Sequence, residues 1–428
     1  MRVAVMTMFN GLSKTYSLVS VVEEQLHMLL NAGHDVKLLV CEDCPHSERY
    51  GIYLDERLQW VPVTNRYAGE QIHWRDYSHA TGQLHPAFFG EADAIARHLQ
   101  EILQDVEVCV LHDILYQGWH LVHNVALRQA QAGLPHVRFV AYTHSLPAAS
   151  CPYASWPFSA RYTPLPNTTY VYPTSSGLAA LARQYGAATT DCRAVPNSIN
   201  LLAEASGPLK SLAGATDLLS PDILAVYPGR LTTGKQFEKA AALAGAVRSV
   251  SGLSVKLVCC DFPSMDIAPD EYKERIRHAG SALGLEEDGL VFTSDCGWPD
   301  GFPHQAVMEL FGLSNLFLCP SYSESFGLIV LEAASRGNLL VLNEAVPALA
   351  ELGDRLGAYF MRWDARGYGF DTTEHYHPSE QAYLQEHAAR IVQRLADNPV
   401  LRAKTAVRRD YNPQSVWERH LRPIVEGR

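Results

Sequence analysis

The sequence predicts an α/β protein made of two Rossmann-like domains, and three observations lead to this. The chain has 428 residues, which is too long for one ordinary core and fits two domains of about 200 residues each. In both halves, apolar runs of strand length alternate with segments whose apolar residues recur at helical spacing, as in a mostly parallel sheet covered by helices. Hydrophobic residues make up 47% of the chain and charged residues 19%, which is typical of a globular enzyme.

The amino-terminal half begins with a strand–helix–strand unit. Residues 3–8 form the first expected strand and residues 36–40 the second. Between them, a loop with Gly11 and Lys14 leads into a helix over residues 16–31, where apolar residues recur every three or four positions. Further strands are expected at 106–111, 137–142 and 169–172.

Two of these strands end in side chains that can take part in chemistry. His112 and Asp113 follow the strand at 106–111, and His144 follows the strand at 137–142. In open α/β sheets, ligands bind beyond the carboxyl ends of the strands. The sequence therefore places all three residues where a ligand is expected.

A segment rich in small residues, 204–216, indicates a domain boundary near 200 to 220. A second series of strands follows it, at 223–227, 255–260, 290–293, 316–319 and 339–342. We therefore expect one Rossmann-like domain over 1–200, a second over 201–405, and a C-terminal helix over 406–428 that packs back on the first.

Charge, apolar runs and cysteine use narrow the class of protein. The net charge of −11 disfavours broad attraction to nucleic acid or anionic lipid. No apolar run approaches the roughly 20 residues that span a bilayer, and residues 1–8 have the pattern of a strand rather than of a secretory signal, so we expect a cytoplasmic protein. The nine cysteines are scattered, which favours reduced thiols, and Cys41-x-x-Cys44 lacks the second pair of a zinc site.

The most informative run, residues 320–337, places two acids across a junction between a loop and a helix. Glu324 falls on the loop, and Glu332 falls inside a helix that starts at Gly327. Eight helical residues span roughly 12 Å, about the distance from a nucleotide's ribose to the sugar beyond its diphosphate. The free backbone N–H groups at the helix start are suited to hold the diphosphate between them.

A second run, residues 227–237, carries two cations on a glycine-bearing loop between a strand and a helix. Gly229 and Arg230 come directly after the strand, and Lys235 precedes the helix. Two positive charges on such a loop suit a dianionic leaving group.

The acid run resembles the Glu-x7-Glu signature of the retaining glycosyltransferases of family 4, which have the GT-B fold of two Rossmann-like domains facing across a deep cleft. The cationic run is similar to the family's G-R-L-x-x-x-K run and precedes the acids by about 90 residues, as the family requires. Residues 195–200 resemble the family's V-P-N-G-V-D hinge, with Ser198 in place of glycine, and residues 33–36 give a weaker match.

The resemblance implies roles for individual residues. Glu324 would contact hydroxyls of the donor sugar, Glu332 would hold the ribose hydroxyls, and Arg230 and Lys235 would clamp the diphosphate. His144 matches a family histidine that lies close to the reacting sugar, so the catalytic candidates are His144, Glu324, Arg230 and Lys235. The donor-binding candidates are Gly11, Lys14, Asn197, Gly229, Ser325, Phe326, Gly327, Leu328 and Glu332.

Two departures from the family pattern affect its donor site. Residues 259–263 replace the glycine-rich turn that many relatives carry after the second strand of the carboxyl-terminal domain. The amino-terminal loop has Gly11 in place of a glycine pair. Neither departure affects the acid pair or the cationic loop.

The resemblance further implies transfer of a hexosyl or pentosyl group, with retention of configuration and without a metal or cofactor. The donor would be a nucleoside-diphosphate sugar, of UDP or GDP type. Three alternatives stay open: a glycosyltransferase that modifies nucleobases or DNA, a noncatalytic sugar-nucleotide-binding subunit, and a GT-B epimerase.

The acceptor is expected to be soluble rather than a lipid. The helix over 16–31 carries Glu23 and Glu24 and no Lys or Arg, unlike a helix that docks on a membrane. Candidates for contact with the acceptor are His112, Asp113, Trp74 and Trp156. The last two lie in aromatic-rich segments that would stack on a sugar, an aromatic aglycone or an extruded nucleobase.

Overall fold

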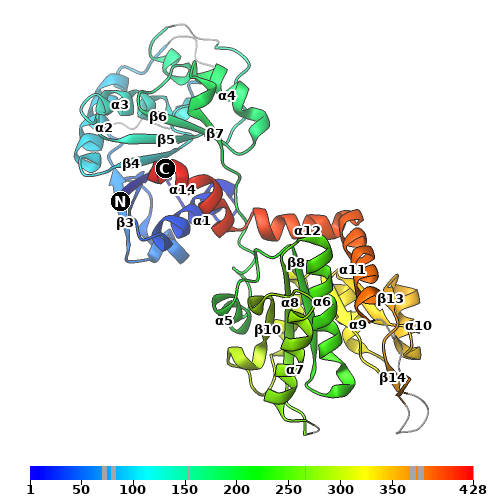
Figure 1. Ribbon diagram of the computed structural model, residues 1–428. Coiled ribbons are helices and arrows are strands. Elements are labelled where there is room, and N and C mark those ends of the chain that lie inside the picture. The colour runs from blue at the N-terminus through cyan, green and yellow to red at the C-terminus, as the bar shows by residue number, and fades with distance from the viewer. Residues whose placement is uncertain are drawn as a thin grey trace. The chain divides into compact units, whose positions relative to one another are not determined.

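The computed structural model describes residues 1–69, 75–78, 83–151, 155–265, 267–366, 373–374 and 380–427 (Figure 1). The chain divides into unit 1, Met1–Ile199 with Pro413–Arg428, and unit 2, Asn200–Asn412. Each unit has its own parallel sheet covered by helices, so the predicted α/β class with two Rossmann-like domains is confirmed. A cleft between the two domains stays a prediction.

The sheet of unit 1 has seven parallel strands in the order β3-β2-β1-β4-β5-β6-β7. They are β1 (Arg2–Met6), β2 (Asp35–Cys41), β3 (Leu58–Val63), β4 (Val108–His112), β5 (Arg138–Tyr142), β6 (Thr168–Tyr172) and β7 (Cys192–Ala194), and the helices are α1 (Ser17–Asn31), α2 (Phe88–Leu103), α3 (Leu121–Gln131) and α4 (Leu178–Tyr185). In β1, Val3 and Val5 belong to one buried cluster, and Ala4 and Met6 belong to another. Because both faces of the sheet are covered, β1 is apolar from Val3 to Met6 instead of alternating with polar residues.

The carboxyl-terminal segment of the chain completes unit 1. It consists of α13 (Pro413–Val416), a π-helical turn (Trp417–Leu421) and α14 (Arg422–Glu426). Trp417 packs edge-on against His34, with ring centroids 5.7 Å apart. Arg138 of β5 donates to the carbonyl oxygens of Ile424 at 3.0 Å and Val425 at 2.6 Å. The segment joins unit 1 from Pro413, later than the expected residue 406, because residues 406–412 lie in unit 2.

The sheet of unit 2 has six parallel strands in the order β10-β9-β8-β11-β12-β13. They are β8 (Ile223–Arg230), β9 (Val255–Phe262), β10 (Leu290–Phe292), β11 (Leu316–Cys319), β12 (Leu339–Asn343) and β13 (Tyr359–Met361). The helices are α5 (Gly207–Ala215), α6 (Phe237–Ser251), α7 (Pro269–Ser281), α8 (His304–Leu313), α9 (Leu328–Ser335), α10 (Pro347–Leu356), α11 (Glu380–Asp397) and α12 (Pro399–Asp410). A short antiparallel pair, β14 (Ala365–Arg366) and β15 (Thr373–Glu374), lies between β13 and α11.

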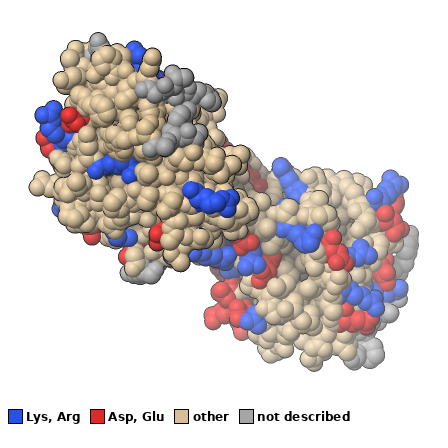
Figure 2. All heavy atoms as spheres, turned by 90° about the horizontal axis from the view of Figure 1, so that it is seen from above, with Lys and Arg blue, Asp and Glu red and all other residues tan. Residues whose placement is uncertain are grey.

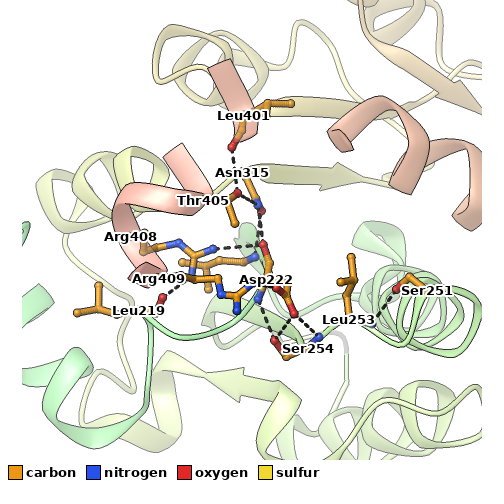
Figure 3. Close-up of polar contacts among 11 residues, drawn as sticks. Leu219, Asp222, Ser251, Leu253, Ser254, Asn315, Leu401, Thr405, Arg408 and Arg409 are labelled. Atoms are coloured by element: carbon orange, nitrogen blue, oxygen red, sulfur yellow. Dashed lines mark hydrogen bonds and ion pairs between the residues drawn. The ribbon is translucent and has the colours of Figure 1, made fainter. Parts of the chain in front are cut away.

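Helix α12 is fastened to the amino-terminal edge of this sheet (Figure 3). Arg408, almost fully buried, donates to the carbonyl oxygens of Leu219 at 2.9 Å and Asp222 at 3.4 Å. Arg409 forms an ion pair with the Asp222 carboxylate, just before β8. Burial lowers the pKa of Arg408 to about 10. These contacts lie at the end of the sheet where the strands begin, opposite to the end that carries the carboxyl termini of the strands.

The surface in Figure 2 carries acidic and basic side chains that are interspersed on that face rather than separated into one basic stripe. None of the helices in the described part of the chain is long and apolar enough to cross a membrane.

Candidate active site

A pocket of about 580 Å³ opens in unit 2 where β8 and β11 end. From β8 the chain continues to β9 and β10 on one side of the sheet, and then to β11, β12 and β13 on the other. The pocket therefore lies at the point where the strand order reverses, which is where open α/β sheets bind ligands. Six residues predicted from the sequence line it: Gly229, Arg230, Lys235, Glu324, Gly327 and Leu328.

The cationic loop is fixed by its own hydrogen bonds. After β8, the Thr232 side chain accepts from the Gly234 amide at 3.1 Å. Gln236 then adopts a left-handed conformation with φ of 50° and donates to the carbonyl oxygen of Pro320 at 2.6 Å. These bonds hold the Arg230 and Lys235 loop against the acid loop that follows β11.

The two loops meet at a position that only glycine fits. A Cβ on Gly234 would lie 2.6 Å from the Tyr322 ring, closer than real Cβ contacts. The Tyr322 amide also donates to the carbonyl oxygen of Gly234 at 3.1 Å. This close approach brings the cations and Glu324 to one pocket wall.

Helix α9 starts as the sequence predicts, with Gly327 as its N-cap residue. Gly327 has φ of 86°, and a Cβ there would lie 3.1 Å from Leu349. The left-handed conformation turns the chain from the loop into the helix, and Gly327, Leu328 and Ile329 line the pocket. The first backbone amides of α9 are thus near the cations, where they favour an anion.

The charges of the pocket are only partly compensated. The Lys235 ammonium forms an ion pair with Glu324, whose side chain is 16% exposed. The Arg230 guanidinium makes no hydrogen bond or ion pair with any residue that the structure describes, and it lines the pocket. One uncompensated positive charge beside a helix N-terminus gives this pocket electrostatics that favour an anion.

Three of the donor residues predicted in unit 2 are not among those that line the pocket: Ser325, Phe326 and Glu332. Ser325 and Phe326 are exposed. Glu332 lies in the second turn of α9, and its carboxylate is 2.9 Å from the imidazole of His304. His304 begins α8, and sequence reasoning missed it because no local spacing connects it to Glu332.

In unit 1, three of the predicted residues come together at the carboxyl ends of β4 and β5. His112 Nδ1 and His144 Nε2 are 3.0 Å apart, and their rings stack with an interplanar angle of 13°. Tyr142 stacks on both rings. Asp113 accepts from the His144 amide at 2.8 Å and has φ of 59°. The expected cluster therefore exists, with His112 buried behind the half-buried His144.

Burial changes the protonation of this cluster. It lowers the pKa of His144 to about 4, and it lowers that of His112 well below the ordinary value, with help from His144. Burial also raises the pKa of Asp113 to about 6. At neutral pH both imidazoles are thus neutral, so each ring has one nitrogen that donates and one that accepts a hydrogen bond.

The loop after β1, where the sequence predicts phosphate contacts from Gly11 and Lys14, lies beside the Glu48 carboxylate. The Glu48 carboxylate accepts from the Leu12 amide at 2.8 Å, and a Cβ on Gly11 would lie 2.9 Å from the same carboxylate. Lys14 lies over the ring of Tyr50, with its ammonium 4.5 Å from the centroid. Gly11 therefore leaves room for the Glu48 carboxylate, and phosphate contact by Gly11 and Lys14 stays a prediction.

The remaining candidates lie away from these two clusters or outside the described residues. Asn197 is exposed in the connection between β7 and unit 2. Trp156 is 53% exposed, and Trp74 lies outside the residues that the structure describes.

Two further observations concern thiol chemistry and metal binding. Burial raises the pKa of Cys41 to about 12 and that of Cys44 to about 11, so neither thiol is a ready nucleophile or metal ligand. Within the described ranges, no group of three or more His, Cys, Asp or Glu side chains is placed to hold a metal ion.

No protein-family model matches the chain, and no curated protein matches it in sequence. Solved structures that match the chain include an E. coli structure described as trehalose-6-phosphate bound with UDP-2-fluoro glucose, at 13% identity, with 100% of this chain and 99% of that chain covered and a TM-score of 0.36. A sucrose-phosphate synthase from Thermosynechococcus elongatus has 13% identity, coverage of 100% and 98%, and a TM-score of 0.37. A glycosyltransferase from Rickettsia africae has 10% identity, coverage of 100% and 98%, and a TM-score of 0.34. At scores this low, the matches assign neither a family nor a substrate to this chain.

Proposed function

We propose that the protein is a retaining glycosyltransferase of GT-B type that moves a sugar from a nucleoside-diphosphate sugar to an acceptor hydroxyl. The observation that carries the proposal is the unit 2 pocket, which gathers Arg230, Lys235, Glu324 and the start of α9 at the switch point of the sheet. This combination suits a ligand that joins a diphosphate to a polyhydroxyl group.

The diphosphate would lie between the cationic loop and the first turn of α9. The Arg230 guanidinium has no side-chain partner among the described residues and is available to a phosphate oxygen. Lys235 would leave Glu324 and bind a second phosphate oxygen. When the bond to the sugar breaks, charge develops on the departing phosphate, and groups fixed beforehand around it lower the barrier. Because two cations and a helix start supply this charge, the proposed reaction requires no metal.

Glu324 and Glu332 would orient the two ends of the donor. Once Lys235 turns to phosphate, the Glu324 carboxylate is able to accept hydrogen bonds from hydroxyls of the donor sugar. Glu332, in the second turn of α9, would hold the ribose hydroxyls, with His304 fixing its carboxylate at 2.9 Å. The donor would be of UDP or GDP type.

The cluster at His144 would supply the acceptor side. The proposal requires that unit 1 presents His144 to the reacting sugar in the closed state, with Asp113 near the acceptor. The C1–O bond to the diphosphate breaks, and the acceptor oxygen bonds to C1 on the same face. The acceptor proton passes to the departing phosphate oxygen, so configuration is retained without an enzyme nucleophile.

The test is product analysis with the full-length chain in EDTA. Nucleotide sugars are incubated with a set of soluble sugar, aglycone and nucleoside acceptors, and release of nucleoside diphosphate is followed together with the anomeric proton of the product. The proposal expects release that requires acceptor and a product with the donor's anomeric configuration. A product with inverted configuration would contradict the retaining mechanism. An epimerised donor formed without acceptor would indicate an epimerase, and binding without turnover would indicate a noncatalytic sugar-nucleotide-binding subunit.

A further inference from the structure

In unit 1, the Glu48 carboxylate is hydrogen-bonded to the loop that follows β1. Glu48 accepts from the Leu12 amide at 2.8 Å, and its Oε2 atom occupies the space in which a side chain on Gly11 would lie. Gly11 to Lys14 connect β1 to α1, beside the carboxyl end of β4, because β1 and β4 are neighbours in the sheet. The carboxylate therefore lies at the switch point of unit 1, where a ligand of this sheet is expected.

The charged groups around this loop are predominantly acidic among the described residues. Glu23 approaches the same region, since its Oε1 atom would lie 3.0 Å from a Cβ on Gly51. Burial, and to a lesser extent the charge of Asp113 after β4, raises the pKa of Tyr16, the residue just before α1. Glu48 and Asp113 thus both contribute negative charge near the residues that lead into α1.

The two cations nearby are directed to aromatic rings. Lys14 lies over Tyr50, and Arg49 lies over Trp60 with its guanidinium carbon 5.1 Å from the ring. Arg49 also donates to the carbonyl oxygen of Tyr53 at 2.6 Å. A phosphate at this loop would need the Leu12 amide as a hydrogen-bond donor, but that amide already donates to the Glu48 carboxylate.

We propose that Glu48 is a specificity-determining residue that makes unit 1 select an uncharged, hydroxyl-rich acceptor and reject a phosphorylated one. Carboxylates accept hydrogen bonds from hydroxyl groups and repel phosphates, so one side chain favours the first ligand and disfavours the second. This inference rests on the proposed function, since it names the acceptor class of that reaction, and it assigns the loop with Gly11 and Lys14 to the acceptor rather than to the donor phosphate.

The experiment compares wild type with Glu48→Gln, which keeps an oxygen for the Leu12 amide and removes only the charge. The probes are pairs of a free sugar and its phosphate, such as glucose and glucose 6-phosphate, and binding to the full-length chain is measured by calorimetry at low ionic strength. The control is Glu101→Gln, the same charge change at an exposed position of α2.

The proposal expects wild type to bind the free sugar of at least one pair in preference to its phosphate. Glu48→Gln should raise the relative affinity for the phosphate at least tenfold, and Glu101→Gln should leave it unchanged. Preference of wild type for the phosphates, an unchanged ratio in Glu48→Gln, or no binding of any free sugar overturns the proposal. Binding of UDP and GDP is measured in the same samples, so failure of the donor site is seen separately.

Discussion

Lys235 and Glu324 form an ion pair across the unit 2 pocket, although they are 89 residues apart in the chain. Both side chains are required at the donor in the proposed reaction, one for the diphosphate and one for the sugar. Without a donor, each satisfies the other. In the proposed reaction, donor binding would exchange this ion pair for two contacts with the ligand, and Arg230, which has no side-chain partner among the described residues, would provide the first attraction.

Replacing Arg230 should weaken binding of nucleoside diphosphates more than binding of nucleosides. A hydrogen bond to a charged group contributes about 1.5–3 kcal/mol, so Arg230→Ala should lose roughly 10- to 100-fold in affinity for the diphosphate. Calorimetric titration with both ligands measures the difference. Arg402→Ala, at an exposed position of α12, is the matched control and should bind like wild type. Equal losses for nucleoside and diphosphate would argue that Arg230 acts through folding.

Gly327 should be essential for the entry into α9. Gly327→Ala combines a left-handed φ of 86° with a contact 3.1 Å from Leu349, and we expect it to lower the free energy of unfolding by about 1–3 kcal/mol. Gly312→Ala in α8, where an added Cβ meets nothing, should instead stabilise the protein by about 0.5–1 kcal/mol. Urea unfolding of both variants measures the effect. Equal behaviour of the two variants would show that the conformation of Gly327 is not required.

Asp113 should make stability depend on pH in a defined direction. Its pKa is about 6 in the folded protein, raised by burial from an ordinary value of 3.8, so between these values the folded state binds the proton and the unfolded state does not. The contribution of Asp113 to the free energy of unfolding should thus fall by roughly 3 kcal/mol as pH rises from about 4 to about 6. His144, whose pKa is lowered to about 4, contributes with the opposite sign.

Comparison of wild type with Asp113→Asn isolates this contribution, because His144 is present in both proteins. The difference in unfolding free energy, measured by denaturant titration at a series of pH values, should decrease through this window and be constant above it. A difference that is flat or that rises with pH would contradict the protonated, buried state of Asp113.

Glu332 should discriminate ribose from deoxyribose if it holds the ribose hydroxyls. Wild type is expected to bind a ribonucleoside diphosphate roughly 10-fold more tightly than its 2′-deoxy analogue, and Glu332→Ala should remove that preference. His304→Ala should reduce it, because His304 orients the carboxylate at 2.9 Å. Equilibrium binding of the two nucleotides to the three proteins gives the answer. A preference that survives in Glu332→Ala would place the ribose elsewhere.

The sequence predicted the features that local patterns encode. Apolar runs located most strands, Gly327 marked the start of α9, and the two charged runs named residues that do line one pocket. Strand β3 was missed because Leu58–Val63 contains a proline and lies at the edge of the sheet, where alternation is weak. The edge strands β7 and β13 were also missed, because three residues are too few to show a strand pattern.

Contacts between distant parts of the chain could not be predicted in this way. Glu48 and Leu12 are 36 residues apart, and His304 and Glu332 are 28 apart, so no periodicity links either pair. For the same reason, the sequence could suggest a phosphate contact at Gly11 but could not show that the Glu48 carboxylate lies beside it. Residue types at the strand ends thus predicted which side chains lie together there, but the charge around them depends on side chains from distant parts of the chain.

The most direct measurement is thermal unfolding in EDTA with UDP, GDP, ADP and dTDP, each alone and as its common sugar conjugates. A ligand at 100 times its dissociation constant stabilises the native state by about 2.7 kcal/mol, which is a readily detected shift. We expect a shift with UDP or GDP in wild type and its loss in Arg230→Ala. No shift with any nucleotide, or a shift that Arg230→Ala leaves intact, would contradict a donor diphosphate in the unit 2 pocket.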